Sequence, residues 1–308
     1  MKQLSPGDGA IALRMKIAFV TTCKGRLHHL KRSLPLMVAQ GAAEVIVVDY
    51  GCPDQSGAWV EANFPAVKVV RVTDDPAFSL ARARNFGARE SQSDWLVFID
   101  ADIETAAGWA GWMQDHLESG HFYRVAPIDG ERDHEAYGTV ICARQDYEAI
   151  GGFDEAFRGW AGEDEDFYDR LVRHGALQAD YPAEFVNPIR HGDEERIGMT
   201  PGWSRHRQII VNQCYIAAKR HFGMLGGRDD ALPLEKRIEL LETTQKVLVK
   251  WFGEGAREPL TIRYSLRGNE ARWLPAPYAM ATESTFIVRV GRRRRTARSA
   301  VGAEPSGG

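Results

Sequence analysis

A short apolar run at residues 95–99, Trp-Leu-Val-Phe-Ile, ends abruptly at two carboxylates, Asp100 and Asp102. An unbroken apolar run bounded by polar residues is typical of a strand buried on both faces, as in a parallel sheet. The carboxylates then follow the carboxyl end of that strand, where open α/β sheets bind their ligands. Residues i and i+2 of an extended chain point to the same side, so both carboxylates can share a hard divalent cation that in turn holds a diphosphate. The alternative interpretation is a solvated, Asp-rich loop after a strand.

Before this run, strand and helix patterns alternate along the chain. The strand patterns cover residues 16–21, 44–49, 67–72 and 94–99, and the helix patterns cover residues 29–38, 56–64 and 80–89. Ser79 is placed to cap the last of these helices. The alternation predicts a Rossmann-like half, a parallel sheet with right-handed crossovers. The loop after the first strand lacks a Gly-x-Gly-x-x-Gly turn, which argues against a dinucleotide cofactor.

Beyond Asp102 the pattern becomes more mixed. We expect further helices at residues 105–117, 146–150, 163–174, 204–222 and 234–252, and further strands at 122–126, 139–143, 261–264 and 285–290. The fold class is therefore α/β, a mixed sheet flanked by helices, with a helical C-terminal extension. The expected parts are a disordered leader at 1–14, an α/β domain at 15–200, a helical extension with small strands at 201–290 and a disordered basic tail at 291–308.

The composition describes a large globular chain with little overall charge. Its 308 residues are 44% hydrophobic and the formal net charge is −3, which does not point to nucleic acid. No Cys-x-x-Cys pair occurs among the four cysteines, which favours reduced thiols in a cytosolic compartment. No stretch approaches the ~20 apolar residues of a membrane span, and the N-terminus lacks the apolar core of a signal peptide.

The last segment differs in charge from the rest of the chain. Residues 292–308 carry five Arg and one Glu, which leaves residues 1–291 with a net charge of −7. A solvated tail is the first interpretation of the arginine run at 292–295, a patch for anionic lipid is the second, and nucleic-acid binding is a distant third. We therefore expect a cytoplasmic protein without a nucleic-acid partner, with peripheral contact at the inner face of the cell membrane as the second interpretation.

A second acidic group opens the predicted helix after Gly162 and consists of Glu163, Asp164, Glu165 and Asp166. The helix dipole favours carboxylates in a first turn, so a well-charged helix start is the simpler interpretation. Four adjacent acids also repel one another, which tends to raise the pKa of at least one of them. Such a carboxylate, close to an aromatic ring such as Trp160 that can stack on a sugar, suits a general base for a hydroxyl nucleophile.

These segments together resemble a known enzyme family. Gly151-Gly152-Phe153-Asp154-Glu155, followed by Trp160-Ala161-Gly162-Glu163-Asp164-Glu165-Asp166, resembles the signature of β-1,4-galactosyltransferase-like enzymes. It is also similar to the bacterial chondroitin polymerase and polypeptide N-acetylgalactosaminyltransferase domains, all of them inverting GT-A glycosyltransferases. The Asp-x-Asp at 100–102 precedes Glu163 by 63 residues, a separation similar to the family's. The resemblance covers about residues 15–195 and implies a GT-A fold.

The resemblance implies a metal site and a catalytic base. Asp102 matches the direct metal ligand, and Asp100 matches the residue that lies against the ribose and the metal shell. His191 is the candidate for a further ligand of Mn²⁺ or Mg²⁺, because imidazole binds such cations alongside carboxylates. Asp164 occupies the position of the catalytic base, with Glu163 beside it.

The resemblance also implies an acceptor side, which comprises Gly152, Trp160 and Asp166. The family's Trp-Gly-Gly becomes Trp-Ala-Gly in this chain, and its third acid becomes Glu165, so the departures from the pattern lie on that side.

Nucleotide-binding residues are expected at the ends of the strands. The loop that in the family lies over the uridine and the phosphates aligns with Thr22, Cys23, Lys24 and Arg26. Asp49 is placed to accept from the uracil N–H, with a turn residue as the alternative. The segment 78–87 resembles the part of the family fold that passes beneath the diphosphate, where Arg84 would be a charge partner. The alternative for Arg82 and Arg84 is a solvated helix face.

Taken together, the resemblance predicts a metal-dependent inverting glycosyltransferase, with Asp164 as general base. It would move a hexose or N-acetylhexosamine from a UDP-sugar to a hydroxyl of a carbohydrate, glycolipid or glycoprotein, as in surface polysaccharide biosynthesis. Galactose and N-acetylgalactosamine lead as donor sugars. A sugar nucleotidyltransferase is one alternative, although the acidic helix start has no role in it. A non-catalytic sugar- or protein-binding module on the same fold is the other. The oligomeric state stays open.

Overall fold

The computed structural model describes residues 14–75, 78–159, 161–192, 204–225, 232–256, 259–268 and 282–291. The chain divides into two compact units, Met1–Leu241 and Glu242–Gly308. The predicted leader apart from Arg14, and the predicted basic tail beyond Gly291, lie outside the described residues. The four-part division expected from the sequence stays a prediction.

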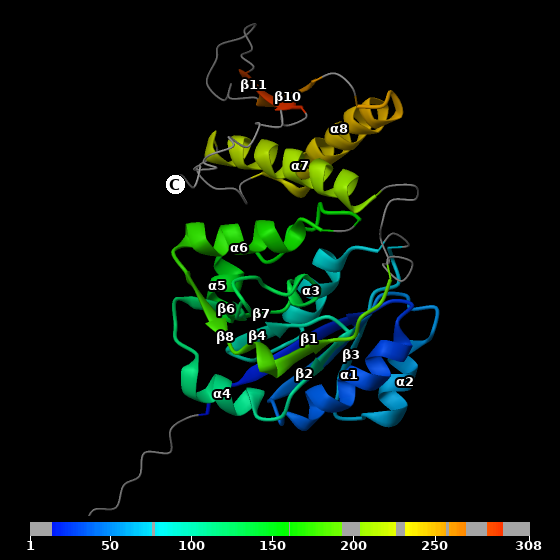
Figure 1. The fold of residues 1–308 in the computed structure, drawn as a ribbon, viewed down its shortest axis with the longest axis vertical. Coiled ribbons are helices and arrows are strands. Elements are labelled where there is room, and N and C mark those ends of the chain that lie inside the picture. Colours follow the sequence, from blue (N-terminus) through cyan, green and yellow to red (C-terminus); the bar gives the residue numbers. More distant parts are fainter. Residues whose placement is uncertain are drawn as a thin grey trace, which may run out of the picture. The chain divides into compact units, whose positions relative to one another are not determined.

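A seven-stranded mixed sheet in the order β3-β2-β1-β4-β7-β6-β8 forms the centre of the first unit (Figure 1). Its strands are β1 (Ile17–Cys23), β2 (Glu44–Asp49), β3 (Lys68–Arg71), β4 (Trp95–Phe98), β6 (His121–Val125), β7 (Val140–Ala143) and β8 (Leu177–Tyr181). The neighbours from β3 to β4 are parallel, β7 is antiparallel to both β4 and β6, and β8 is parallel to β6. Every residue of β4 is buried, as a central strand covered on both faces requires.

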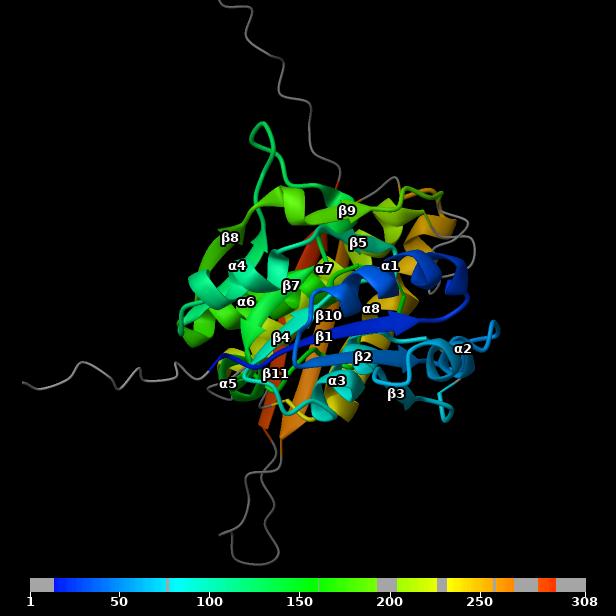
Figure 2. The ribbon, with the colours of Figure 1, turned by 90° about the horizontal axis from the view of Figure 1, so that it is seen from below.

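Helices cover both faces of this sheet (Figures 1 and 2). One face carries α1 (Leu27–Ala39), α2 (Ser56–Asn63) and α4 (Trp109–His116), and the other carries α3 (Leu80–Arg89), α5 (Arg144–Ala149) and α6 (Glu163–His174). Each face has its own hydrophobic core, with Leu30 and Trp109 in the first and Phe98 and Phe167 in the second. The α/β class with a mixed, mostly parallel sheet is therefore confirmed.

Helix α3 brings its polar side chains close to the sheet. Its N-cap is Ser79, whose hydroxyl accepts from the backbone N–H of Arg82 at 3.3 Å, as predicted. A Cβ added at Gly87 would clash with Val20 and Val48, so only glycine lets the helix approach β1 and β2 this closely. The close approach holds Arg84 of α3 beneath the strand ends.

A small second sheet pairs β5 (Ile103–Thr105) with β9 (Val186–Pro188), next to the short helices η1 (His134–Ala136) and η2 (Ala183–Phe185). The backbone N–H of Ile189 continues this pairing and donates to the carbonyl of Asp102 at 2.7 Å. The chain that follows β9 is thereby held against the Asp-x-Asp segment, which brings His191 to Asp102.

The helix α7 (Arg205–Leu225) packs against α6 in the first unit, and α8 (Leu234–Gly253) contains the boundary between the units. The second unit includes an antiparallel pair of strands, β10 (Leu260–Gly268) and β11 (Thr282–Val290). The hydroxyls of Thr244 and Tyr264 lie 2.8 Å apart there. Among the described residues, no helix combines the length and the apolar character that crossing a membrane demands.

The structure differs from the expected elements in several places. The helix expected at 105–117 begins only at Trp109, because residues 103–105 pair with β9 instead. Strands β8 and β9 were not expected at all. The helix expected to stop at Gly223 continues to Leu225.

Candidate active site

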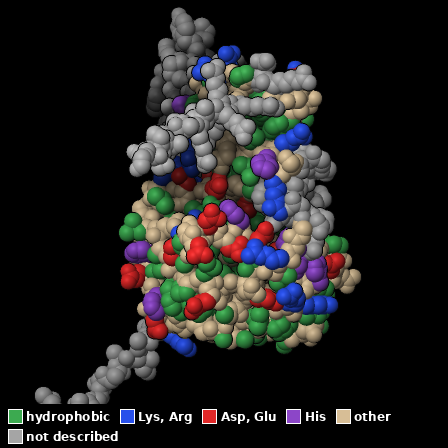
Figure 3. Space-filling model, viewed as in Figure 1, with side chains coloured by type: hydrophobic (Ala, Val, Ile, Leu, Met, Phe, Trp, Pro, Cys, Tyr) green, Lys and Arg blue, Asp and Glu red, His purple; other side chains and the backbone are tan. Residues whose placement is uncertain are grey.

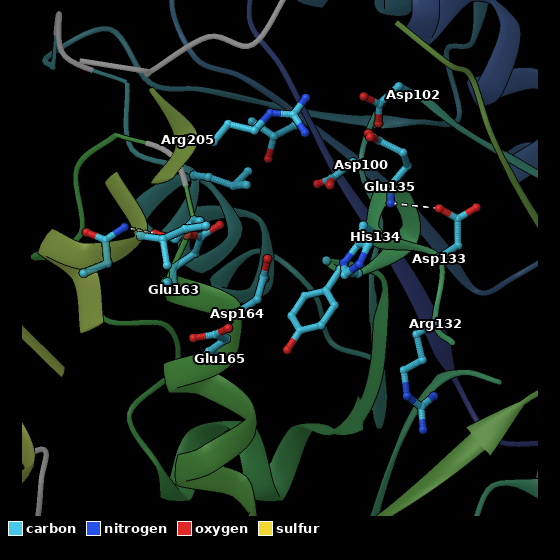
Figure 4. Close-up of a pocket in the computed structure, with 18 of the residues that line it drawn as sticks. Asp100, Asp102, Arg132, Asp133, His134, Glu135, Glu163, Asp164, Glu165 and Arg205 are labelled. Carbon is cyan, nitrogen blue, oxygen red and sulfur yellow. Dashed lines mark hydrogen bonds between the residues drawn. The ribbon is translucent and has the colours of Figure 1, made fainter. Parts of the chain in front are cut away.

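A cavity of about 940 Å³ opens beyond the carboxyl ends of β1 and β4. Four groups of residues from distant parts of the chain contribute to its lining: the strand-end residues Thr22, Lys24, Arg26, Asp100 and Asp102; the first turn of α6, residues 163–165; residues 131–135 with 137–138 of the loop before β7; and residues of α7. Figure 4 shows Asp100 and Asp102 on one side of this space and Glu163, Asp164 and Glu165 on the other. Acidic side chains also gather in the middle of the face seen in Figure 3.

Arg84 joins the two acidic groups. Its guanidinium donates from Nη1 to Asp164 Oδ1 at 2.5 Å and from Nη2 to Asp100 Oδ1 at 3.1 Å. Glu163 Oε1 lies 3.9 Å from Nη1, and the side chain of Arg84 is only 2% exposed. A Cβ added at Gly138 would lie 2.7 Å from Nη2, so this glycine leaves room for the guanidinium. The arrangement fixes Asp100 and Asp164 on one buried cation.

The acids of α6 hold their protons more tightly than usual. Burial, together with the charge of neighbouring Asp164, raises the pKa of Glu163 to about 8. Burial also raises the pKa of Asp164, whereas the nearby Arg84 opposes that rise. With Arg84 in direct contact with Asp164 and farther from Glu163, the arrangement favours a proton on Glu163 and an ionised Asp164 near neutral pH.

Asp102 has two partners at one oxygen. Arg26 Nη1 lies 2.7 Å from Oδ2, and His191 Nε2 lies 2.8 Å from the same atom. The other ring nitrogen of His191 faces the carbonyl of Gly192 at 2.9 Å. Burial and the charge of Asp100 raise the pKa of Asp102, against the opposing effect of Arg26 and His191. Asp102 and His191, the two residues predicted to bind one metal ion, are therefore in direct contact.

Asp102 and His191 are suitable ligands for a divalent cation whose remaining ligands come from a bound nucleotide. In the described part of the chain, no three His, Cys, Asp or Glu side chains are grouped so as to hold a metal ion. Mg²⁺-type sites in nucleotide enzymes use one or two carboxylates and take further oxygens from the substrate phosphates. The carboxylate of Asp102 and the imidazole of His191, which lie 2.8 Å apart, match this requirement.

Three of the predicted nucleotide residues, Cys23, Asp49 and Arg84, are not among the residues that line the cavity. The thiol of Cys23 is completely buried in the core. Asp49 uses both carboxylate oxygens to accept backbone N–H groups, from Cys52 at 2.7 Å and from Gly57 at 2.8 Å. It lines a separate cavity of about 260 Å³. The structure therefore favours the alternative for Asp49, a residue that holds the turn after β2.

The predicted contact between Arg84 and a diphosphate also disagrees with the structure. Arg84 is enclosed by Asp100, Asp164 and the carbonyl of Gly138 rather than open to the cavity. Arg82 is not on a solvated helix face either, since its side chain is 19% exposed and pairs with Asp74 at 2.8 Å and with Asp75 at 3.3 Å.

The predicted acceptor side needs a similar correction. Asp166 is completely buried, where it binds Arg170 Nε at 2.9 Å and pairs with Lys219. Gly152 takes part in internal hydrogen bonds, and its carbonyl accepts from Arg170 at 2.6 Å. Neither residue faces the cavity, because the helical period turns Asp166 away from the side that Glu163 and Asp164 share. Trp160 lies outside the described residues.

Two walls of the cavity come from segments that the sequence did not indicate as part of the site. The loop before β7 contributes His134, Glu135 and Tyr137, and α7 contributes Arg205, His206, Ile209, Asn212 and Gln213. Arg205 is drawn at the edge of the cavity in Figure 4. Helix α7 reaches the site because Asn212 donates to the carbonyl of Ala161 and Gln213 to Glu165. The only hint in the sequence was the concentration of charge at residues 129–135.

Comparisons with known proteins find similar sequences among the galactosyltransferases. The family described as the N-terminal domain of galactosyltransferase matches residues 121–192. Mouse β-1,4-galactosyltransferase 1 is 25% identical over 201 residues, which cover 59% of this chain and 43% of that protein. The chain spans less than half the length of the curated relatives it matches.

Two solved structures share the fold. TarS residues 1–349 of S. aureus, in complex with UDP-GlcNAc, gives a TM-score of 0.52 at 15% identity and covers 75% of this chain and 72% of that one. GalNAc-T7 with UDP, GalNAc and Mn²⁺ gives a TM-score of 0.51 at 16% identity and covers 79% of this chain and 56% of that one. The family match, the galactosyltransferase relative and the shared fold make the chain similar to the GT-A glycosyltransferases, and in particular to the galactosyltransferases and N-acetylgalactosaminyltransferases.

Proposed function

We propose that this chain is a metal-dependent inverting glycosyltransferase. It moves a hexose or an N-acetylhexosamine, with galactose and N-acetylgalactosamine favoured, from a UDP-sugar to an acceptor hydroxyl. The observation that carries the proposal is the pairing of Asp100 and Asp164 with one buried guanidinium at a single cavity. Because of this pairing, the acids on the donor side and the candidate base lie close enough to act on a UDP-sugar and an acceptor bound in the same cavity.

The donor half of the cavity is its strand-end side. Lys24 and Arg26 supply two cations there beside Asp100 and Asp102, which suits a diphosphate. Asp102 and His191 would hold a divalent cation, which would supply positive charge to offset the charge that develops on UDP as it leaves. The complexes of GalNAc-T7 with UDP and Mn²⁺ and of TarS with UDP-GlcNAc support this class of donor for the present chain.

The catalytic step is a single displacement. Asp164 accepts the proton of the acceptor hydroxyl while its oxygen forms a bond to the anomeric carbon. The bond between that carbon and the UDP oxygen breaks on the opposite face, so UDP leaves and the configuration is inverted. Arg84 keeps Asp164 ionised and oriented, and Glu163 retains its proton because its pKa is raised to about 8.

The acceptor half is formed by the loop before β7 and by α7. Polar and apolar side chains alternate there, with His134 and Tyr137 from the loop and His206 and Ile209 from the helix. Ile209 is 40% exposed, although it is apolar and lies at the cavity. A sugar ring offers both hydroxyls and an apolar face, so this wall suits a carbohydrate acceptor.

The test is a donor screen. The protein is incubated with UDP-galactose, UDP-N-acetylgalactosamine, UDP-glucose and UDP-N-acetylglucosamine, with Mn²⁺ or with EDTA, and UDP release is measured. We expect release from at least one donor that depends on the cation and is lost in Asp102→Asn. Nuclear magnetic resonance of the product of a productive acceptor should show an inverted anomeric centre.

The same screen separates the alternatives. Pyrophosphate release from a nucleoside triphosphate and a sugar 1-phosphate, without UDP release from any UDP-sugar, would establish a nucleotidyltransferase instead. Binding of UDP-sugars with no release under any condition would point to a module that binds without catalysis. Either result contradicts the proposed transfer.

A further inference from the structure

Asp102 already carries a cation at the oxygen that a metal ion requires. Arg26 Nη1 and His191 Nε2 lie 2.7 and 2.8 Å from Oδ2. The contact is sheltered, because the side chains of Arg26 and Asp102 are 18% and 12% exposed. The guanidinium therefore compensates negative charge at the point where the proposed cation has to bind.

A divalent cation and the guanidinium cannot both keep close contact with this one oxygen, because two neighbouring cations repel each other. The side chain of Arg26 has an alternative partner in a bound diphosphate. It lines the cavity together with Thr22 and Lys24, on the side proposed for the diphosphate. A planar guanidinium binds phosphate oxygens in a bidentate fashion, as it does carboxylates.

The backbone of the loop is held while the side chain changes partner. The carbonyl of Arg26 accepts from the N–H groups of His29 and Leu30, each at 3.1 Å, at the start of α1. The N–H of Leu27 donates to Asp54 at 3.2 Å, and the N–H of Gly25 donates to the sulfur of Cys52 at 3.2 Å. A change of partner by Arg26 would therefore involve its side chain, since the loop backbone is held by these hydrogen bonds.

We propose that Arg26 competes with the divalent cation for Asp102, and that the diphosphate of the donor ends this competition by taking over the guanidinium. Cation and nucleoside diphosphate then bind synergistically, and each strengthens the binding of the other by the same factor. This inference rests on the proposed function and adds to it a specific role for one residue in the assembly of the donor site.

Titration calorimetry of the full chain with Mn²⁺, in the absence and presence of UDP, tests the competition without any turnover. The variants are Arg26→Gln and Lys24→Gln. Lys24 is a matched control, since it carries the same charge at the same cavity but has its Nζ 5.4 Å from the centre of the Tyr50 ring. We expect Arg26→Gln to bind Mn²⁺ alone about tenfold more tightly than the wild type and to gain less from UDP. Lys24→Gln should change Mn²⁺ affinity much less.

Two outcomes overturn the inference. One is an Arg26→Gln protein that binds Mn²⁺ alone no more tightly than the wild type. The other is an equal gain in Lys24→Gln, since general charge in the cavity would then account for the effect. Arg26→Met, which keeps the aliphatic stem, takes the place of Arg26→Gln if that variant does not fold. A wild-type protein that binds neither Mn²⁺ nor UDP contradicts the proposed function itself, whereas the two outcomes above contradict only the role of Arg26.

Discussion

At the scale of single residues, Arg84 determines the geometry of the site. Its charge is 2% exposed, so water screens it poorly, and Asp100, Asp164 and the more distant Glu163 compensate it. Loss of the guanidinium would leave three buried or half-buried acids close together without their common cation. These acids would then repel one another and retain protons, and a protonated Asp164 cannot act as a base.

We therefore expect Arg84→Gln to lower kcat for sugar transfer by about 100-fold or more. Arg84→Lys should fall between this variant and the wild type, because an ammonium keeps the charge but lacks the planar fork. Steady-state UDP release gives kcat, and calorimetry gives UDP affinity separately. The control is Arg82→Gln, which removes a neighbouring arginine bound to Asp74 at the surface. An Arg84→Gln enzyme with near-normal kcat would show that the pairing is not needed.

A second prediction concerns Glu163 and the pH dependence of stability. Its pKa is raised to about 8 in the fold from an ordinary value of 4.5. The folded state therefore binds more protons than the unfolded state between these values, and stability falls as pH rises, by at most about 1.4 kcal/mol per pH unit from this group. Urea unfolding in EDTA at several pH values between 5.5 and 7.5 measures the slope. Glu163→Gln should flatten it, and an unchanged slope would contradict the assigned proton.

At the scale of elements, one side of α6 lines the cavity and the other side packs in the interior. Glu163 and Asp164 face the cavity, while Asp166 binds Arg170 and pairs with Lys219 of α7. Lys219 also binds Asp154 of the segment before α6, at 2.9 Å. This buried ion network fixes α7 on α6 and thereby fixes the wall of the cavity that α7 forms.

We expect Lys219→Met to lower the free energy of unfolding by about 3 kcal/mol, because two buried carboxylates lose a partner. Urea denaturation of the two proteins measures the difference. Lys236→Met is the control: its ion pair with Glu239 is exposed, and such pairs contribute about 0–1 kcal/mol. Equal effects of the two substitutions would mean that the buried network contributes no more than a surface pair.

Helices and strands that are specified by neighbouring residues could be predicted from the sequence, whereas strands that depend on a remote pairing partner could not. The apolar run at 95–99 and the cap at Ser79 are local patterns, and both gave the observed elements β4 and α3. Strand β8 has exposed residues, among them Leu177 at 62%, and depends on pairing with β6, which lies far away in the sequence. Its pattern alone therefore gave no indication of a strand. Residues 103–105 were assigned to a helix for the same reason, since their partner β9 is remote.

The site was predictable in its chemistry and less so in its contacts. The two acidic groups are visible as motifs, and both line the cavity. Whether a given polar residue faces the cavity depends on helix phase and local hydrogen bonds, and these turned Asp166 and Asp49 to internal partners. Helix α7 lies beyond the family resemblance, so nothing in the sequence indicated that it lines the cavity.

At the scale of the whole molecule, a single cavity is proposed to contain both the donor-binding residues and the catalytic base. The donor half comes from the ends of β1 and β4 and the base from α6, and these parts are joined through Arg84. The claim predicts that binding of the nucleotide and removal of the acceptor proton can be separated by mutation, because different residues perform them.

Asp164→Asn tests this separation most directly, with UDP affinity in Mn²⁺ measured by calorimetry and sugar transfer measured on the same preparation. We expect UDP affinity to stay close to that of the wild type while transfer falls by about 10²–10⁴-fold, the usual contribution of a general base. Asp169→Asn, on the same helix and paired with Arg173 at 2.7 Å, serves as the control and should retain both properties. An Asp164→Asn protein that keeps most of its turnover would contradict the assignment of the base and with it the proposed union of the two halves.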